Sequence, residues 1–256
     1  MENTSYITLS RQTVLRRQMD VLANNLANIS TPAFKSEALM VIEHDTPIAT
    51  QGPKSMRTVA FVKDFATVRD MSEGPLFHTD NPLDMAISGP GYFSIQTPDG
   101  ERFTRQGAFL LNGKGQLVTM AGQPVLDARG RPIVVPPGSG EIEVAHDGTI
   151  SARNPALQTQ NVVLGQLKIS QFDNEYMLKR EANGLYKPDQ GVTPKPVAQP
   201  KVMQGMIEKS NVNGIVEMTK LIDTVRSFQS AGNLMEEEHN RQLNAIDTLT
   251  KSSLTA

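Results

Sequence analysis

Apolar residues near the amino end of the chain are spaced as they are on one face of a helix. They step by four and three positions, which is the spacing of a heptad seam: Leu15, Met19, Leu22, Leu26 and Ile29. We predict a helix over residues 5–29 that ends at Ser30-Thr31-Pro32, because the residue before a proline resists the helical conformation. The spacing fits two interpretations, a seam for a partner helix and an amphipathic helix packed on its own domain.

The carboxyl end carries a second helical pattern, from about residue 214 to residue 250. Its seam weakens in the middle and then resumes: Met218, Leu221, Val225, Phe228, Ile246 and Leu249. A continuous helix of this length spans about 55 Å, which is more than a small β domain can cover. Because isolated helices are marginal in water, we expect both ends to become ordered when the chain assembles with neighbouring subunits.

Short segments that favour strands fill the region between the helices. Glycine-containing turns separate these segments, as in an irregular sandwich or rolled sheet, and the strand candidates are 93–96, 109–111, 116–119, 133–135 and 162–172. We predict an α+β fold in which the terminal helices form a coiled-coil layer beside a central all-β domain. The predicted segments are an axial helix with a signature (1–35), an extended connection with little regular structure (36–75), the β domain (76–186), a proline-rich linker (187–204) and a second axial helix (205–256).

Charge and composition exclude several classes of function. The chain has 256 residues, a net charge of −2 and no cysteine, so we expect neither a nucleic-acid binder nor a thiol enzyme. The terminal stretches carry opposite surpluses of charge, positive in 3–29 and negative in 214–250. Opposite surpluses favour pairing of the two ends, although a solvated acidic face explains the glutamates equally well.

Candidate chemistry is sparse. The four histidines are far apart in the sequence, and we interpret the stretch from His78 to Asp84 as a turn and not as a metal site. The sequence contains no transmembrane segment and no apolar run of signal-peptide length in its first thirty residues. We therefore expect no enzyme activity, no metal, no cofactor, no small-molecule substrate and no cleaved signal peptide.

Four motifs resemble those of bacterial flagellar rod and hook proteins, in the same order along the chain. They are Ala23–Lys35, Asn81–Phe93, Phe103–Phe109 and Ser210–Asn213, and the first has Ala33 where that family commonly has glycine. The signature residues that we carry over are Asn24, Asn25, Asn28, Thr31, Phe34, Lys35, Asn211 and Val212. For the three asparagines of the first helix, fixing a seam register and capping the helix end are both consistent with the sequence.

The resemblance implies a structural subunit of the flagellar basal-body rod. Such proteins pass through the flagellar type III export apparatus and assemble helically in the periplasm with copies of themselves and neighbouring rod proteins. The rod then transmits torque from the motor to the hook. Length and the opening residues 1–6 resemble the proximal-rod members, with the distal-rod member as the alternative. A trimeric adhesive or glycan-binding β protein is the alternative from another class.

Overall fold

The chain divides into two compact units, each built from separate stretches of sequence. The computed structural model describes residues 2–47, 58–153 and 161–254. One unit, here called the helix–hairpin unit, contains Met1–Ala27, Glu37–Asp70 and Asn213–Ala256. The other, here called the β unit, contains Asn28–Ser36 and Met71–Val212.

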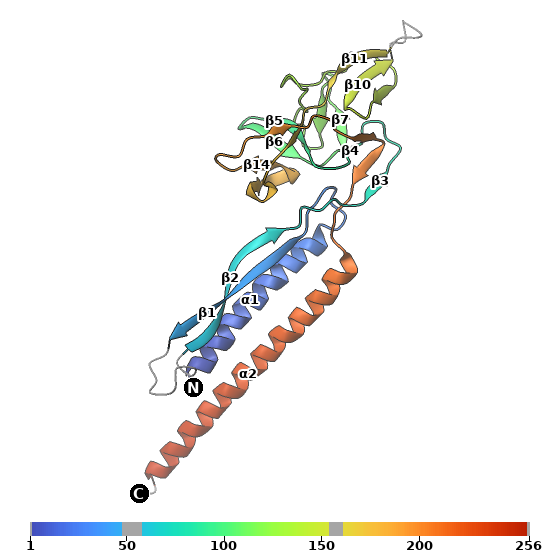
Figure 1. Cartoon of the computed structure of the whole chain (residues 1–256). Helices are drawn as coiled ribbons and strands as arrows, with labels where there is room; N and C mark the ends of the chain where they lie inside the picture. The colour runs from blue at the N-terminus through green and yellow to red at the C-terminus, as the bar shows by residue number, and fades with distance from the viewer. Residues whose placement is uncertain (1, 48–57, 154–160, 255–256) are drawn as a thin grey trace. The chain divides into compact units, whose positions relative to one another are not determined.

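Two helices and one strand pair form the helix–hairpin unit. Helix α1 (Glu2–Ala27) contacts helix α2 (Gly214–Leu254) and both strands of the hairpin, β1 (Glu37–Pro47) and β2 (Thr58–Arg69). In Figure 1 the two helices lie side by side and run in opposite directions, and the hairpin follows α1. A register shift between Met40 and Val41 interrupts the antiparallel pairing of the strands.

Both helices agree with the sequence pattern to within a few residues. Helix α1 ends at Ala27, and the next turn is closed by a hydrogen bond from the Thr31 N–H to the Asn28 carbonyl. Helix α2 begins at Gly214 because Asn213 caps it, its Oδ1 accepting hydrogen bonds from the N–H groups of Ile215 and Val216. The predicted pair of terminal helices with a β-rich centre is thus confirmed.

The β unit consists of short strands in small sheets. A six-stranded sheet has the order β13-β14-β6-β5-β12-β15, and a three-stranded sheet has the order β11-β10-β9. Three two-stranded pairs, β16-β4, β17-β3 and β7-β8, complete the unit. The strand bounds are β3 Leu76–His78, β4 Met85–Ile87, β5 Tyr92–Thr97, β6 Gly100–Thr104, β7 Phe109–Leu111, β8 Leu117–Thr119, β9 Ile142–Val144, β10 Thr149–Arg153, β11 Asn161–Gln166, β12 Ile169–Gln171, β13 Leu178–Arg180, β14 Tyr186–Pro188, β15 Lys195–Pro196, β16 Val202–Gln204 and β17 Met206–Glu208.

Two apolar clusters form the core of the β unit. The larger one gathers aliphatic side chains and two phenylalanines, and the rings of Phe93 and Phe109 meet edge to face at 5.2 Å. The smaller one is aromatic: the rings of Tyr92 and Phe103 each pack edge to face on Phe172. Burial raises the pKa of the Tyr92 hydroxyl far above its usual value, with Glu175 adding to the effect.

Several boundaries that we predicted from the sequence are wrong. Among the described residues of 36–75, Glu37–Pro47 and Thr58–Arg69 form the paired strands β1 and β2 instead of an extended connection. The supposed linker 187–204 belongs to the β unit, where β15 pairs with β12 and β16 pairs with β4. Residues 205–212 precede the second helix and contribute β17 to the same unit.

Two strand assignments also need correction. The segment 133–135 makes only an isolated bridge, between Val134 and Gln116. The run 162–172 is two strands in two different sheets, because β11 pairs with β10 whereas β12 pairs with β5 and β15. The other three candidates fall on β5, β7 and β8.

Candidate assembly surface

The apolar residues of α1 are distributed over two contacts within the helix–hairpin unit. Leu22 is buried, and Val14 and Val21 beside it are buried too, which is the wide stripe expected of a helix that touches both α2 and the hairpin. The other predicted seam residues of the helix, Leu15, Met19 and Leu26, are half-buried. Ile29 lies beyond the end of α1 and is exposed.

The fully buried residues of α2 are not the ones that apolar spacing indicated. The buried positions repeat every seven residues: Glu217, Thr224, Ala231 and Glu238. Half-buried residues alternate with them at the same period: Leu221, Phe228, Met235 and Gln242. Sequence reasoning missed the buried set because its members are polar or small, and the only signal was the seven-residue period itself.

A second apolar stripe on α2 is left uncovered in the single chain. Ile215, Met218 and Ile222 step by three and four positions and are 81%, 54% and 53% exposed. Val225 continues this stripe and is half-buried. Of the remaining predicted seam residues, Ile246 is exposed, and the side chain of Leu249 lies outside the described residues. The stripe is therefore a surface on which another helix can pack.

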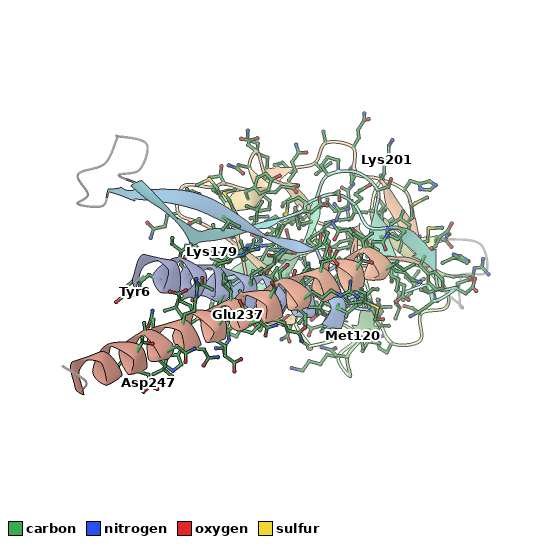
Figure 2. All side chains as sticks on the ribbon, turned by 90° about the horizontal axis from the view of Figure 1, so that it is seen from below. Tyr6, Met120, Lys179, Lys201, Glu237 and Asp247 are labelled. Atoms are coloured by element: carbon green, nitrogen blue, oxygen red, sulfur yellow. The ribbon has the colours of Figure 1, made fainter. Side chains whose placement is uncertain are left out.

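The helices carry exposed polar side chains, and two buried glutamates of α2 are paired within their own helix. The side chains of Tyr6 on α1 and Glu237 on α2 lie on the surface (Figure 2). Two of the α2 glutamates form ion pairs with cations three residues further along the same helix: Glu217 with Lys220, and Glu238 with Arg241.

Asn25 joins three elements of the helix–hairpin unit. Its Nδ2 donates to the carbonyl of Glu37 and to Oε2 of Glu217, both at 2.8 Å. Its Oδ1 accepts from the N–H of Glu37 at 2.9 Å. The end of α1, the start of β1 and the first turn of α2 are thereby held together by one side chain.

The other signature residues of the amino end lie in the β unit or at the end of α1. Asn24 is exposed on α1, and Asn28 accepts from Thr31 with both its carbonyl and its Oδ1, which closes the turn that follows α1. The ring of Phe34 is buried, and the guanidinium carbon of Arg180 lies 4.5 Å from its centroid. Ala33 adopts a left-handed conformation with φ of 55°, which is the conformation that glycine adopts without strain.

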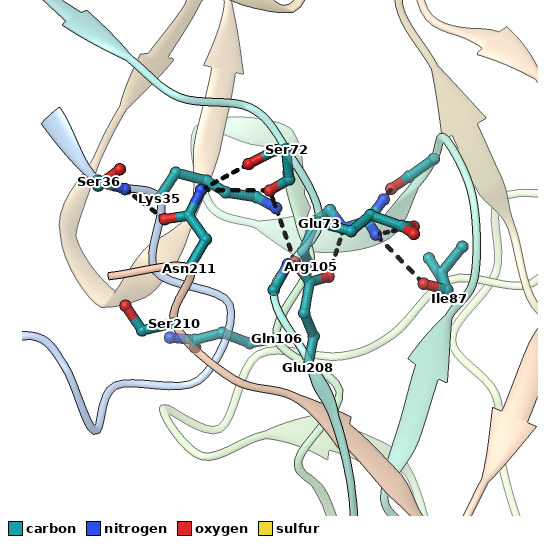
Figure 3. Close-up of polar contacts among 12 residues, drawn as sticks. Lys35, Ser36, Ser72, Glu73, Ile87, Arg105, Gln106, Glu208, Ser210 and Asn211 are labelled. Carbon is teal, nitrogen blue, oxygen red and sulfur yellow. Dashed lines mark hydrogen bonds and ion pairs between the residues drawn. The ribbon is translucent and has the colours of Figure 1, made fainter. Parts of the chain in front are cut away.

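The signature of the carboxyl end ties residues 28–36 to the β unit. Asn211 accepts from the N–H of Ser36 at 2.7 Å and donates to the carbonyl and hydroxyl oxygens of Ser72 (Figure 3). Its N–H donates to the carbonyl of Phe34. Val212 follows it and is buried, and its N–H bonds to the hydroxyl of Ser210.

A buried cluster of charged residues lies near Asn211 in the β unit (Figure 3). Lys35, Arg105 and Glu208 are each at most 5% exposed. The Glu208 carboxylate accepts from Lys35 Nζ and from Arg105 Nε, both at 2.7 Å, and from the N–H of Gly74 at 3.1 Å. Arg105 also donates to the partly exposed Glu73 at 2.8 Å (Figure 3).

The opposite charges of Arg105 and Glu208 shift the pKa of each other's side chain. Burial alone raises the pKa of the Glu208 carboxyl, but the neighbouring charges of Arg105 and Lys35 outweigh it and lower that pKa below its usual value. Burial likewise lowers the pKa of the Arg105 guanidinium, and the Glu208 charge overcomes this and raises it. Arg105 and Glu208 were missed from the sequence, although Arg105 stands inside the third motif.

Histidine and acidic side chains between His78 and Asp84 pair with their neighbours. His78 and Asp80 form an exposed pair at 2.6 Å, and the Asp84 carboxylate accepts from Thr79 and Asn81. Within the part of the chain that the structure covers, no group of three histidine or acidic residues is placed to hold a metal ion. No helix among those residues is long and apolar enough to cross a membrane.

Comparison with known proteins gives matches over most of the chain. Family models match residues 6–35 (flagella basal body rod protein), 86–152 (flagellar hook protein FlgE/F/G D1 domain) and 203–247 (flagellar basal body rod FlgEFG protein C-terminal). The flagellar basal-body rod protein FlgF of Caulobacter vibrioides is 37% identical over 98% of this chain and 99% of its own length. FlgF of Mesorhizobium japonicum is 34% identical over 99% of this chain and 100% of its own length. FlgG of Buchnera aphidicola subsp. Schizaphis graminum is 33% identical over 82% of this chain and 86% of its own length.

Proposed function

Because this chain belongs to the flagellar basal-body rod protein family, we propose that it is a subunit of the proximal rod that assembles helically through its terminal helices. Membership makes it a structural protein of the basal body that assembles with other rod proteins. The proposal adds its place along the rod, the surface that it uses and its mechanical role, which is to transmit torque from motor to hook. In this role the subunit works by packing and carries out no catalysis.

The proximal position is supported by the extent of the similarity. Relatives named FlgF align with 90% to 99% of the chain, whereas those named FlgG align with 82%. The difference favours the proximal over the distal member of the family.

The proposal about assembly is based on the uncovered apolar stripe of α2. Helix α2 already has an intramolecular partner in α1, so the stripe of Ile215, Met218 and Ile222 is a second contact face on the same helix. Burying each of these side chains contributes roughly 1.5–3 kcal/mol, and a polymer gains this at every subunit. We assign the face to a helix of a neighbouring rod subunit, so that the terminal helices form an inner coiled-coil layer.

A pair of single variants tests this assignment. Met218→Glu places a charge on the stripe, and Ser230→Glu places the same charge on an exposed position that lies on neither the stripe nor the inward face of α2. In a strain that lacks the native gene, we expect Met218→Glu to abolish swarming and to be absent from purified basal bodies, and Ser230→Glu to restore both. Normal incorporation of a folded Met218→Glu protein would refute the assignment.

The route to the periplasm is a further part of the proposal. We assign export to the flagellar type III apparatus without a cleaved signal, supported by the lack of cysteine and of a signal-type apolar run. Amino-terminal sequencing of the protein from isolated rods tests this. We expect the segment that forms α1 to be present, and a terminus that begins after it would contradict the proposal.

A further inference from the structure

The sheet of β9, β10 and β11 has one closed edge and one open edge (Figure 1). At the β9 edge the side-chain amide of Gln204 takes the place of a further strand. Its Oε1 accepts from the Val144 N–H at 3.0 Å, and its Nε2 donates to the Ile142 carbonyl at 2.8 Å. Among the described residues, no strand pairs with the outer side of β11. A further strand would therefore join this sheet at β11.

Two residues of β11 direct their backbone groups away from the sheet. Arg153, the last residue of β10, makes its backbone hydrogen bonds on the side that leads into β9. Successive residues of an antiparallel strand bond to opposite sides, so the residue before Arg153 bonds to its partner Val162. The backbone groups of Asn161 and Val163, on either side of Val162, then point outward. These two residues provide the ladder for an added strand.

The composition of β11 does not protect this edge. Edge strands are commonly blunted by charged side chains or by proline, and both edges of the six-stranded sheet have such a residue. Strand β13 carries Lys179 and Arg180, and β15 carries Pro196. Strand β11 has neither in its six residues, and its Val162 and Val163 are 44% and 66% exposed.

Two hollows border the open edge. One, of about 160 Å³, is lined by Val162 and by two prolines of the segment before β9. The other, of about 410 Å³, is lined by Val163, Arg129 and Arg131. Val162 and Val163 point to opposite faces of the sheet, and each borders one of the hollows. Adjacent side chains of an added strand can therefore enter different hollows.

The two hollows differ in charge. Arg131 pairs with Asp127, Nη2 to Oδ2 at 3.3 Å, whereas Arg129 is exposed and forms no ion pair with the described residues. The Asp127 carboxylate also accepts from the backbone N–H groups of both arginines. The larger hollow thus keeps one positive charge in surplus, and the group that complements it is a carboxylate. The smaller hollow, with its prolines and Val162, suits an apolar side chain.

We propose that the outer edge of β11 binds an extended segment of a partner protein by strand addition. The backbone of the segment pairs with Asn161 and Val163. An apolar side chain enters the proline-lined hollow, and an acidic side chain at an adjacent position meets Arg129. This surface lies within the β unit and is separate from the apolar stripe of α2, so it does not depend on the proposed mode of rod assembly.

Synthetic peptides test the surface on the full-length protein. One short labelled peptide alternates valine with glutamate, and a second alternates valine with lysine. By fluorescence anisotropy we expect saturable binding of the glutamate peptide and about two- to fivefold weaker binding of the lysine peptide, the value of an exposed ion pair. A glutamate peptide with an N-methylated backbone, which cannot form the ladder, should not bind. In the complex, hydrogen exchange should slow at the amides of Asn161 and Val163 and not at that of Val162.

Variants of the chain locate the binding. Val163→Pro removes an N–H that points outward, where proline is tolerated, and Val163→Thr keeps that N–H. We expect Val163→Pro to weaken binding of the glutamate peptide by roughly tenfold or more and Val163→Thr to leave it unchanged. Arg129→Glu should reverse the preference between the glutamate and lysine peptides. Circular dichroism confirms that each variant is folded.

Three results would overturn the proposal. In the first, the glutamate peptide does not bind the unmodified protein. In the second, it binds equally well when its backbone is N-methylated, which means that no strand is added. In the third, Val163→Pro leaves peptide binding unchanged but abolishes self-association of the protein in analytical ultracentrifugation, which means that the edge pairs with a second copy of this chain.

Discussion

We expect Glu208→Gln to lower the stability of the β unit strongly. It keeps the size and one acceptor oxygen of the side chain but removes the buried negative charge with which Lys35 and Arg105 both pair. Removing one partner from a buried ion pair costs about 3–5 kcal/mol. Since domains are stable by about 5–15 kcal/mol, we expect a large fraction of the stability of the β unit to be lost.

The comparison with Lys35→Met separates charge from packing. That variant removes the ammonium together with its desolvation cost, and Glu208 keeps Arg105 as its partner. We expect a loss of about 1.5–3 kcal/mol, the value of a hydrogen bond to a charged group. The double variant should cost less than the sum of the two single variants, because Lys35 and Glu208 interact directly.

Acid dependence provides an independent check on the same residue. The pKa of the Glu208 carboxyl is lowered in the folded protein, so its stabilising contribution is complete above the unfolded value of 4.5. The contribution is lost as the pH falls below that value and through the folded pKa. Urea denaturation between pH 3 and pH 7 should show this loss in the unmodified protein and a weaker one in Glu208→Gln. A cost below about 1 kcal/mol at pH 7, or an unchanged acid dependence, would refute the reasoning.

Three smaller predictions concern the backbone. Ala33→Gly should stabilise the protein by 0 to about 1 kcal/mol, because relief of the left-handed conformation slightly exceeds the added freedom of the unfolded chain; a lower urea midpoint would contradict this. Gly107→Ala should destabilise by about 1–3 kcal/mol or more, because the new Cβ would lie 1.5 Å from the Met85 carbonyl oxygen, and an unchanged melting temperature would count against that packing. Asn213→Ala should cost about 1 kcal/mol through loss of the α2 cap, measured by thermal unfolding at the helix signal, whereas Asn213→Ser should restore most of it.

The sequence determines the helices well and the β connections poorly, for a physical reason. A helix is specified by contacts within four residues, so the spacing around Leu22 was sufficient to predict α1. The hairpin strands β1 and β2 depend on partners across the turn, and the register shift at Met40 breaks the alternation that reveals a half-buried strand. The apolar run from Ala38 to Ile42 was therefore not recognised as part of a strand.

Proline misled the prediction around residue 195. Proline-rich composition is typical of linkers, but proline is also tolerated at sheet edges, where no ladder hydrogen bond is needed from its nitrogen. Strand β15 contains Pro196 and lies at the edge of the six-stranded sheet. Composition cannot distinguish a linker from an edge strand, because an edge strand is defined by the strand that pairs with it, here β12.

The candidate site could be predicted only in part, because its residues belong to two units. The first motif, Ala23–Lys35, is continuous in sequence, yet it is divided at Ala27 between the helix–hairpin unit and the β unit. Asn25 acts in the first and Lys35 in the second. Their partners Glu217 and Glu208 lie more than 170 residues away, and spacing rules contain no information at that distance.

The composition of the inward face of α2 is consistent with a helix that must make a second contact. Thr224 and Ala231 bury little apolar area, and Glu217 is buried at the cost of its desolvation. At about 25 cal/mol per Å², such a face contributes less than one built from leucines. The contact of α2 with α1 then depends more on specific polar contacts, such as the one between Asn25 and Glu217. The apolar residues Ile215 and Met218 are exposed in the single chain, so the proposed association of subunits would add apolar burial to that of the inward face.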